Sequence, residues 1–157
     1  MDNHLFKIEL CMKKSLLPMD LLLLADPSLE KIKEYITEGF CFIGSVEDLN
    51  IAVMVLKEVS PSKIELKNLA VAESYQSKGY GKLLLDHAIS FSRKEGYKQL
   101  IVTTGNSSFR PLKIYKQAGF VISHIEKGYF VKKYKEPIFE NGLQCVDRVV
   151  LVKAVGH

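Results

Sequence analysis

The sequence lacks the long apolar run that a membrane-spanning helix requires. Such a helix needs about 20 consecutive apolar residues, and the most apolar stretch, residues 21–25, is short and lies between Asp20 and Asp26. The first residues also lack the basic and then apolar pattern of a signal peptide. We therefore expect no membrane partner.

Cysteine is scarce as well. The three cysteines, Cys11, Cys41 and Cys145, are an odd number without a close pair. This pattern indicates neither a disulfide framework nor a zinc site, and the histidines are too scattered to suggest one. We expect no bound metal, and a reducing cytoplasm is the simplest location for such a chain.

The composition is that of a folded globular protein, with 47% apolar and 25% charged residues. The chain of 157 residues can bury one core and is too short for two domains of ordinary size. We therefore expect a single domain over residues 1–157.

The net charge of +4 is partly concentrated late in the sequence, where lysines alternate with aromatic residues: Lys127, Tyr129, Phe130, Lys132, Lys133, Tyr134 and Lys135. Stacking of bases on the aromatic rings beside lysines would suit a nucleic acid. A solvated strand face explains the same pattern, and nucleic acid is not an expected partner.

Apolar periodicity and the positions of Gly and Pro predict an alternation of strands and helices. The expected strands cover residues 5–12, 40–46, 49–59, 63–72, 99–104, 120–134 and 147–155. The expected helices cover 18–25, 28–37 with Ser28 as the N-cap, 81–95 and 111–118. The order of strand, loop, helix and strand after residue 63 predicts two parallel strands joined by a right-handed crossover, and so an α/β fold.

A glycine-containing loop, Gln76-Ser77-Lys78-Gly79-Tyr80-Gly81-Lys82, joins the strand 63–72 to the following helix. Two glycines one residue apart allow positive φ angles, so that consecutive N–H groups can face one anion. The helix N-terminus and the two lysines add positive potential. The loop therefore suits a pyrophosphate, although a turn without any ligand is the alternative.

The spacing of this loop excludes the two commonest phosphate loops. A dinucleotide fingerprint needs a third small residue where Leu84 stands, and a Walker A loop needs Ser or Thr where Leu83 follows Lys82.

The loop resembles the Q/R-x-x-G-x-G/A motif of the GNAT N-acetyltransferases, with Gln76, Gly79 and Gly81 at the defined positions. The segment 115–120, Tyr-Lys-Gln-Ala-Gly-Phe, is similar to the Y-x-x-x-G-F segment of the same family, and together the similarity covers about residues 63–122. It implies a mixed, strongly twisted sheet with splayed central strands, flanked by helices, and acetyl-coenzyme A as the ligand. The segment 136–142 looks like one found in a subset of bacterial acetyltransferases, which implies a bacterial origin.

The resemblance also implies roles for particular residues. Tyr115 matches the tyrosine that hydrogen-bonds the coenzyme sulfur and acts as general acid, although it could simply pack its helix on the sheet. Backbone N–H groups of Leu69, Ala70 and Val71, freed by a bulge in their strand, would bond the acyl oxygen and the pantetheine amides.

Glu65 matches a strand glutamate that serves as general base in one branch of the family. A base is needed because an alkyl amine with a pKa of about 10 is mostly protonated at neutral pH. An ion pair of Glu65 with Lys63 or Lys67 is an equal alternative. His87 and His124 are candidates by residue type only.

The loop after the strand 99–104 departs from the family pattern. The usual asparagine lies seven residues before the tyrosine, where this chain has Ser108, whereas Asn106 lies nine before it. Either residue could contact the coenzyme.

The function implied is transfer of an acetyl group from acetyl-coenzyme A to a primary amine of a small-molecule or peptide acceptor. The alternative is a coenzyme-binding sensor without turnover. Residues 18–36 and 137–145 would contact the acceptor, and small amines, aminoglycosides, polyamines and protein amines all stay open. A homodimer is compatible with the family.

Overall fold

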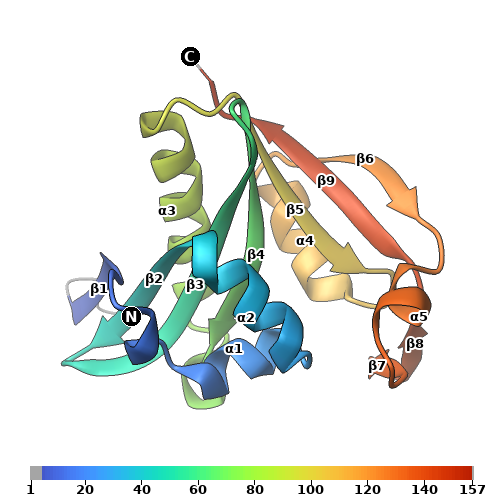
Figure 1. Ribbon diagram of the computed structural model, residues 1–157, viewed down its shortest axis with the longest axis horizontal. Helices are drawn as coiled ribbons and strands as arrows, with labels where there is room; N and C mark the ends of the chain where they lie inside the picture. Colours follow the sequence, from blue (N-terminus) through green and yellow to red (C-terminus); the bar gives the residue numbers. More distant parts are fainter. Residues whose placement is uncertain (1–4, 157) are drawn as a thin grey trace.

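A twisted sheet of seven strands forms the centre of the protein in the computed structural model, which describes residues 5–156 (Figure 1). The strand order is β1-β2-β3-β4-β5-β9-β6, in which β4 and β5 run parallel and the other neighbours run antiparallel. The strands are β1 (Phe6–Leu10), β2 (Phe40–Val46), β3 (Leu49–Ser60), β4 (Lys63–Val71), β5 (Gln99–Gly105), β6 (Val121–Glu126) and β9 (Arg148–Ala154). A separate hairpin consists of β7 (Ile138–Glu140) and β8 (Leu143–Cys145).

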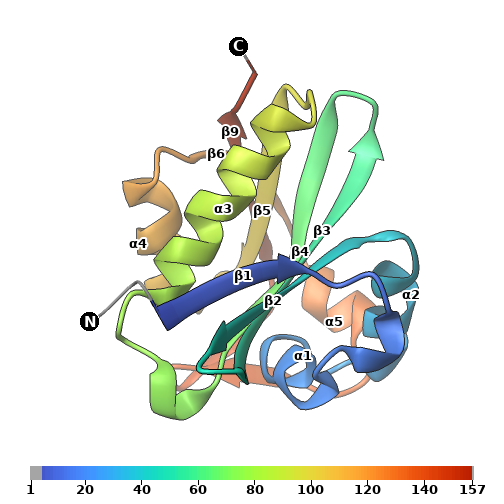
Figure 2. The same cartoon turned by 90° about the vertical axis from the view of Figure 1, so that its left-hand side faces the viewer.

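Helices cover both faces of this sheet (Figure 2). They are α1 (Met19–Ala25), α2 (Leu29–Glu38), α3 (Tyr80–Lys94), α4 (Phe109–Gln117) and α5 (Tyr129–Lys133), with short 3-10 turns at Lys14–Leu16 and Glu73–Tyr75. Within residues 5–156, no helix is long and apolar enough to cross a bilayer.

Two apolar clusters hold the layers together. On one face, Leu84 and Leu85 of α3 are buried against Ile64 of β4, and α4 packs on the same cluster. On the other face, Leu22 and Ile32 pack α1 and α2 against β3. Complete burial of each such side chain contributes about 1.5–3 kcal/mol, so these contacts fix the helices on the sheet.

The central strands β4 and β5 pair over only a short distance. Their register is Lys63 with Gln99, Ile64 with Leu100 and Glu65 with Ile101, and the pairing stops there. Figure 1 shows the two strands diverging beyond this point. This confirms the predicted α/β fold with splayed central strands.

Most predicted elements are present, with ends shifted by a few residues. The hydroxyl oxygen of Ser28 accepts a hydrogen bond from the Lys31 N–H at 3.2 Å, which confirms the predicted N-cap of α2. Helix α4 begins at Phe109, before the predicted start at Pro111.

The prediction of a continuous strand over residues 120–134 was wrong. Strand β6 ends at Glu126, and the chain turns at Gly128 into the short helix α5. Gly128 has a φ of 67°, and its N–H donates to the Asp147 carboxylate at 2.9 Å. Alternation of aromatic residues with lysines over so few positions does not define a strand. The hydrogen bond to the Asp147 carboxylate, which is distant in the sequence, fixes the turn at Gly128.

Candidate active site

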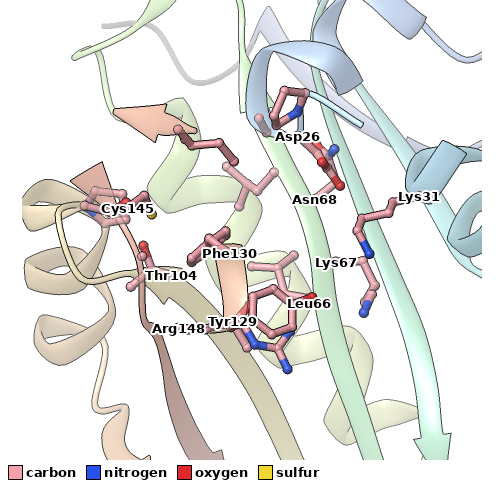
Figure 3. A pocket seen from close by; sticks show the side chains of 18 of the residues that line it. Asp26, Lys31, Leu66, Lys67, Asn68, Thr104, Tyr129, Phe130, Cys145 and Arg148 are labelled. Carbon is pink, nitrogen blue, oxygen red and sulfur yellow. The ribbon is translucent and has the colours of Figure 1, made fainter. Parts of the chain in front are cut away.

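A cavity of about 690 Å³ opens where β4 and β5 separate. Its walls come from both strands, from α4 on one side and from α2 and α5 on the other (Figure 3). Tyr115, Glu65, Tyr35 and Tyr129 are among the residues that line it. Residues from many strands and helices, far apart in the sequence, therefore line one space.

The glycine loop lies at one end of this space, between β4 and α3. Its positive φ angles fall on Ser77 (63°) and Gly79 (92°), so the expectation that Gly81 would have a positive φ was wrong. Gly79 is the N-cap of α3 and provides no side chain to cap the helix. The first N–H groups of an α-helix have no partner within the helix, so those of α3 remain available to an anion.

Two side chains of the glycine loop make contacts that hold the loop in the fold. The Gln76 amide donates to the Val71 carbonyl at 2.9 Å, which ties the loop to the end of β4. The Tyr80 ring is buried with its centroid 4.7 Å from that of Phe6, so that only its backbone can contact a ligand. Lys82 is exposed, and the Lys78 ammonium lies 5.5 Å from the Tyr75 ring centroid. Both lysines remain at the surface beside the N-terminus of α3.

Residues 69–71 form the end of β4 that has no pairing with β5. They pair on their other edge with β3, in the register Leu69 with Met54, Ala70 with Val53 and Val71 with Ala52. The bulge in β4 lies at Lys67, which is the extra residue between the pairs formed by Leu66 and Asn68. The observed bulge is therefore two residues before Leu69, where the expected segment begins. Leu69 lines the cavity, whereas the Ala70 and Val71 side chains are buried in the core.

Tyr115 reaches the cavity from α4. Its ring lies 5.9 Å from that of Phe120, centroid to centroid, and this contact fixes the side chain against the end of the helix. Burial raises the pKa of Tyr115 to about 12. The phenol therefore stays protonated at neutral pH and is able to donate a proton.

Glu65 lies on the opposite wall, on β4. Its carboxylate is 3.3 Å from the Lys67 ammonium, which is the ion pair that the sequence left open as an alternative. Neither of the two histidines lines the cavity. His87 packs its ring 5.0 Å from that of Phe42, where burial lowers its pKa, and His124 is exposed on β6.

The loop after β5 is held by the β7–β8 hairpin and the chain that follows it. The Asn106 carboxamide oxygen accepts from the N–H groups of Val146 at 2.8 Å and Asp147 at 2.9 Å. The Ser108 hydroxyl donates to the Glu140 carboxylate at 2.6 Å and lines the cavity. Of the two candidates in this loop, Ser108 lines the cavity, whereas Asn106 is hydrogen-bonded to the segment that precedes β9.

The same hairpin fills the space beneath the loop. The Asn141 amide donates to the Ser107 carbonyl at 2.7 Å. A Cβ atom on Gly105 would overlap the sulfur of the buried Cys145, so the absence of a side chain at Gly105 lets the hairpin approach. The segment 136–142, noticed in the sequence, thus supports the loop that leads into α4 and Tyr115.

A buried acidic network forms the far wall and was not predicted. The Tyr35 and Tyr134 hydroxyls donate to the two carboxylate oxygens of Asp26 at 3.1 and 2.9 Å. The Asn68 amide donates to the Tyr35 oxygen at 2.9 Å. Burial and the nearby carboxylate raise the pKa values of both phenols. Tyr134 lies 108 residues from Asp26, and no local sequence pattern signals such a contact.

Arg148, at the start of β9, is another lining residue that the sequence did not reveal. Its Nε atom donates to the Glu126 carboxylate, and this hydrogen bond lowers the pKa of Glu126. Burial alone would lower the pKa of Arg148, but the hydrogen bond to Glu126 and the nearby charges of Tyr129, Glu126 and Glu65 together outweigh it, and the pKa is raised. The guanidinium therefore stays charged within the cavity wall.

The features of the cavity indicate the kind of ligand that it could hold. Among residues 5–156, no group of three or more His, Cys, Asp and Glu side chains is arranged to hold a metal ion. The cavity joins the open edge of β4 to the protonated phenol of Tyr115, and Gln76 of the glycine loop before α3 also lines it. An amide chain along the strand edge, with an anion at the nearby N-terminus of α3, matches this arrangement.

Comparison with known proteins gives one consistent result. Residues 15–120 match the model of the Acetyltransferase (GNAT) family. The uncharacterized N-acetyltransferase YvbK of Bacillus subtilis (strain 168) is 44% identical over 132 residues, which are 84% of this chain and 85% of that protein.

Solved structures agree with the sequence match. A GNAT family acetyltransferase from Elizabethkingia anophelis with acetyl-CoA bound is 39% identical, with a TM-score of 0.93 over 96% of this chain and 98% of that one. The IAA acetyltransferase from Bacillus cereus ATCC 14579 is 42% identical, with a TM-score of 0.91 over 95% of this chain and 99% of that one.

Proposed function

The chain belongs to the acetyltransferase (GNAT) family and is an acetyl-CoA-dependent acyltransferase, and on that premise we propose that it acetylates a primary amine by direct attack, with Tyr115 as general acid. The observation that carries the proposal is that the Tyr115 phenol and the open edge of β4 line one cavity, which Gln76 of the loop before α3 also lines.

Each end of the cavity has a separate task in this proposal. The N–H groups of residues 77–82, with Lys78 and Lys82, bind the coenzyme pyrophosphate. Backbone groups of Leu69, Ala70 and Val71 bind the pantetheine amides and the acyl oxygen, and Ser108 contacts the coenzyme from the other side. When bound, acetyl-coenzyme A supplies an acyl group activated as a thioester.

Proton transfer is divided between the two walls. Tyr115 donates a proton to the departing sulfur, whose ordinary pKa of about 8.5 makes it a fair leaving group. Glu65, on β4, accepts a proton from the amine directly or through water, because the neutral amine is the nucleophile. The Lys67 ammonium, 3.3 Å from the Glu65 carboxylate, holds that carboxylate on the β4 wall.

Calorimetric titration with acetyl-coenzyme A, followed by measurement of thiol release with a panel of amines, tests the proposal. We expect a dissociation constant on the order of 10 μM, as is common for enzyme substrates, and amine-dependent release of thiol. A folded protein that binds no acetyl-coenzyme A would contradict the proposal. Binding without release for any amine would favour the sensor instead.

Replacement of Glu65 by Gln tests the base. We expect kcat at neutral pH to fall by about 100-fold, which is the usual contribution of a general base, and the fall to lessen as the pH approaches the pKa of the amine. The Lys67→Met variant is the matched control, because it removes the same ion pair and leaves the carboxylate. Equal losses in both variants would show that the ion pair supports the strand and that Glu65 is no base.

A further inference from the structure

Three of the basic side chains that line the cavity are labelled in Figure 3: Lys31, Lys67 and Arg148. Each lies over the ring of a tyrosine. The distances from cation to ring centroid are 5.4 Å for Lys31 over Tyr134, 5.9 Å for Lys67 over Tyr35 and 4.0 Å for Arg148 over Tyr129. Because ammonium and guanidinium groups are attracted to aromatic faces, these contacts hold the three cations at the wall.

Four carboxylates on this side, Asp26, Glu65, Glu126 and Glu140, are already engaged, whereas Glu34 has no ion pair within 4.0 Å among the described residues. Asp26 accepts hydrogen bonds from Tyr35, Tyr134 and the N–H of Ser28. Glu65 is paired with Lys67, and Glu126 with Arg148. Glu140 accepts from Ser108, and Glu34 is exposed on α2, one turn after Lys31.

Two of the cations keep capacity for a further partner. Lys31 forms no ion pair within 4.0 Å among the described residues, which include Glu34. Arg148 uses Nε toward Glu126, which leaves its two terminal nitrogens for another acceptor. A guanidinium with both terminal NH2 groups free matches the two oxygens of a carboxylate.

We propose that the acceptor is a small amine that also carries a carboxylate, and that Arg148 and Lys31 bind this carboxylate. This inference rests on the proposed function and narrows its acceptor. A polyamine or an aminoglycoside would place additional ammonium groups beside Lys31, Lys67 and Arg148. Repulsion between these like charges disfavours such a complex. The carboxylate is bound on the side of α2 and α5, away from the α3 N-terminus that serves the coenzyme.

Two probes of the same shape test the carboxylate subsite. Protein saturated with coenzyme A, which occupies the pyrophosphate site, is titrated with 3-phenylpropionate and with its neutral amide, and binding is followed by NMR. We expect the carboxylate to bind at least about tenfold more tightly, because hydrogen bonds to charged groups exceed neutral ones by such a factor. The preference should shrink at high salt, since the site is open to solvent.

Variants assign this preference to the two cations. Lys31→Met should reduce it severalfold, and Arg148→Gln should nearly remove it, because the glutamine cannot pair with a carboxylate. Lys94, exposed at the end of α3 and away from the cavity, gives the matched control, and Lys94→Met should leave the preference unchanged. The half-buried Lys31 carries no ion pair that its loss would disrupt, so its result stands even if Arg148→Gln is unstable.

The outcomes separate this inference from the proposed function. Failure of the protein to bind coenzyme A at all would count against the proposed function. Binding of coenzyme A without any preference for the carboxylate probe, or without binding of either probe, would overturn the carboxylate subsite and leave the acetyltransferase proposal intact. A preference that survives both variants would also overturn the subsite.

Discussion

The Gly79→Asp variant is expected to raise the dissociation constant for acetyl-coenzyme A by at least about 100-fold. Gly79 has a φ of 92° at the N-cap of α3, where a carboxylate would face the bound pyrophosphate. The loss combines like-charge repulsion with the hydrogen bonds of charged phosphates, each of which contributes about 1.5–3 kcal/mol. Calorimetric titration of both proteins measures the change.

Gly96→Asp is the matched control for this variant. Gly96 has a φ of 90°, so aspartate meets nearly the same backbone strain there, and a Cβ atom at this position has nothing within 4 Å. Gly96 follows the C-terminal end of α3, at the opposite end of the helix from the glycine loop. Similar losses of coenzyme binding in the two variants would mean that strain is responsible and that the loop is no anion site.

The Tyr115→Phe variant is expected to lower kcat by about 100-fold while the dissociation constant of acetyl-coenzyme A changes little. The substitution removes a proton donor from the sulfur and keeps the ring against Phe120. Because burial raises the pKa of Tyr115 to about 12, the wild-type phenol stays protonated below that pH. We therefore expect no loss of kcat from ionisation of this tyrosine between neutral pH and pH ~10.

Tyr97→Phe provides the comparison. Tyr97 is also buried and also has a pKa raised to about 12, but its hydroxyl donates to Glu58 at 2.7 Å and it does not line the cavity. Pre-steady-state thiol release should be normal in this variant and slow in Tyr115→Phe. If the two variants have the same kcat, the assignment of Tyr115 as the acid fails.

The sequence was most informative where the site is built from neighbours along the chain. Apolar periodicity and glycines located β4, the loop and α3 as one unit, because a strand, a turn and a helix follow each other there without a break. Gly119 and Phe120 set the position of Tyr115 at the end of α4, and Gly119 indeed has a φ of 94°. Local backbone preferences are sufficient for such features.

Tertiary contacts determine the rest, and for that reason the sequence did not reveal it. The position of α5 depends on a bond between Gly128 and Asp147, and the acidic network joins Asp26 to Tyr134 across most of the chain. The choice between Asn106 and Ser108 depends on a hairpin that follows them by about 30 residues. Spacing in the sequence carries no information on pairs so far apart.

The place of β9 in the sheet has a consequence for synthesis of the protein. This strand lies between β5 and β6, although it follows both in the sequence. On the ribosome, β5 and β6 therefore emerge without the strand that joins them, and the apolar side chains of β5 stay without their partner until residues 148–154 have left the exit tunnel. Translation adds about 5–20 residues per second. For that interval the first four strands and α3 can already pack together, whereas the half that carries Tyr115 is exposed to chaperones and proteases.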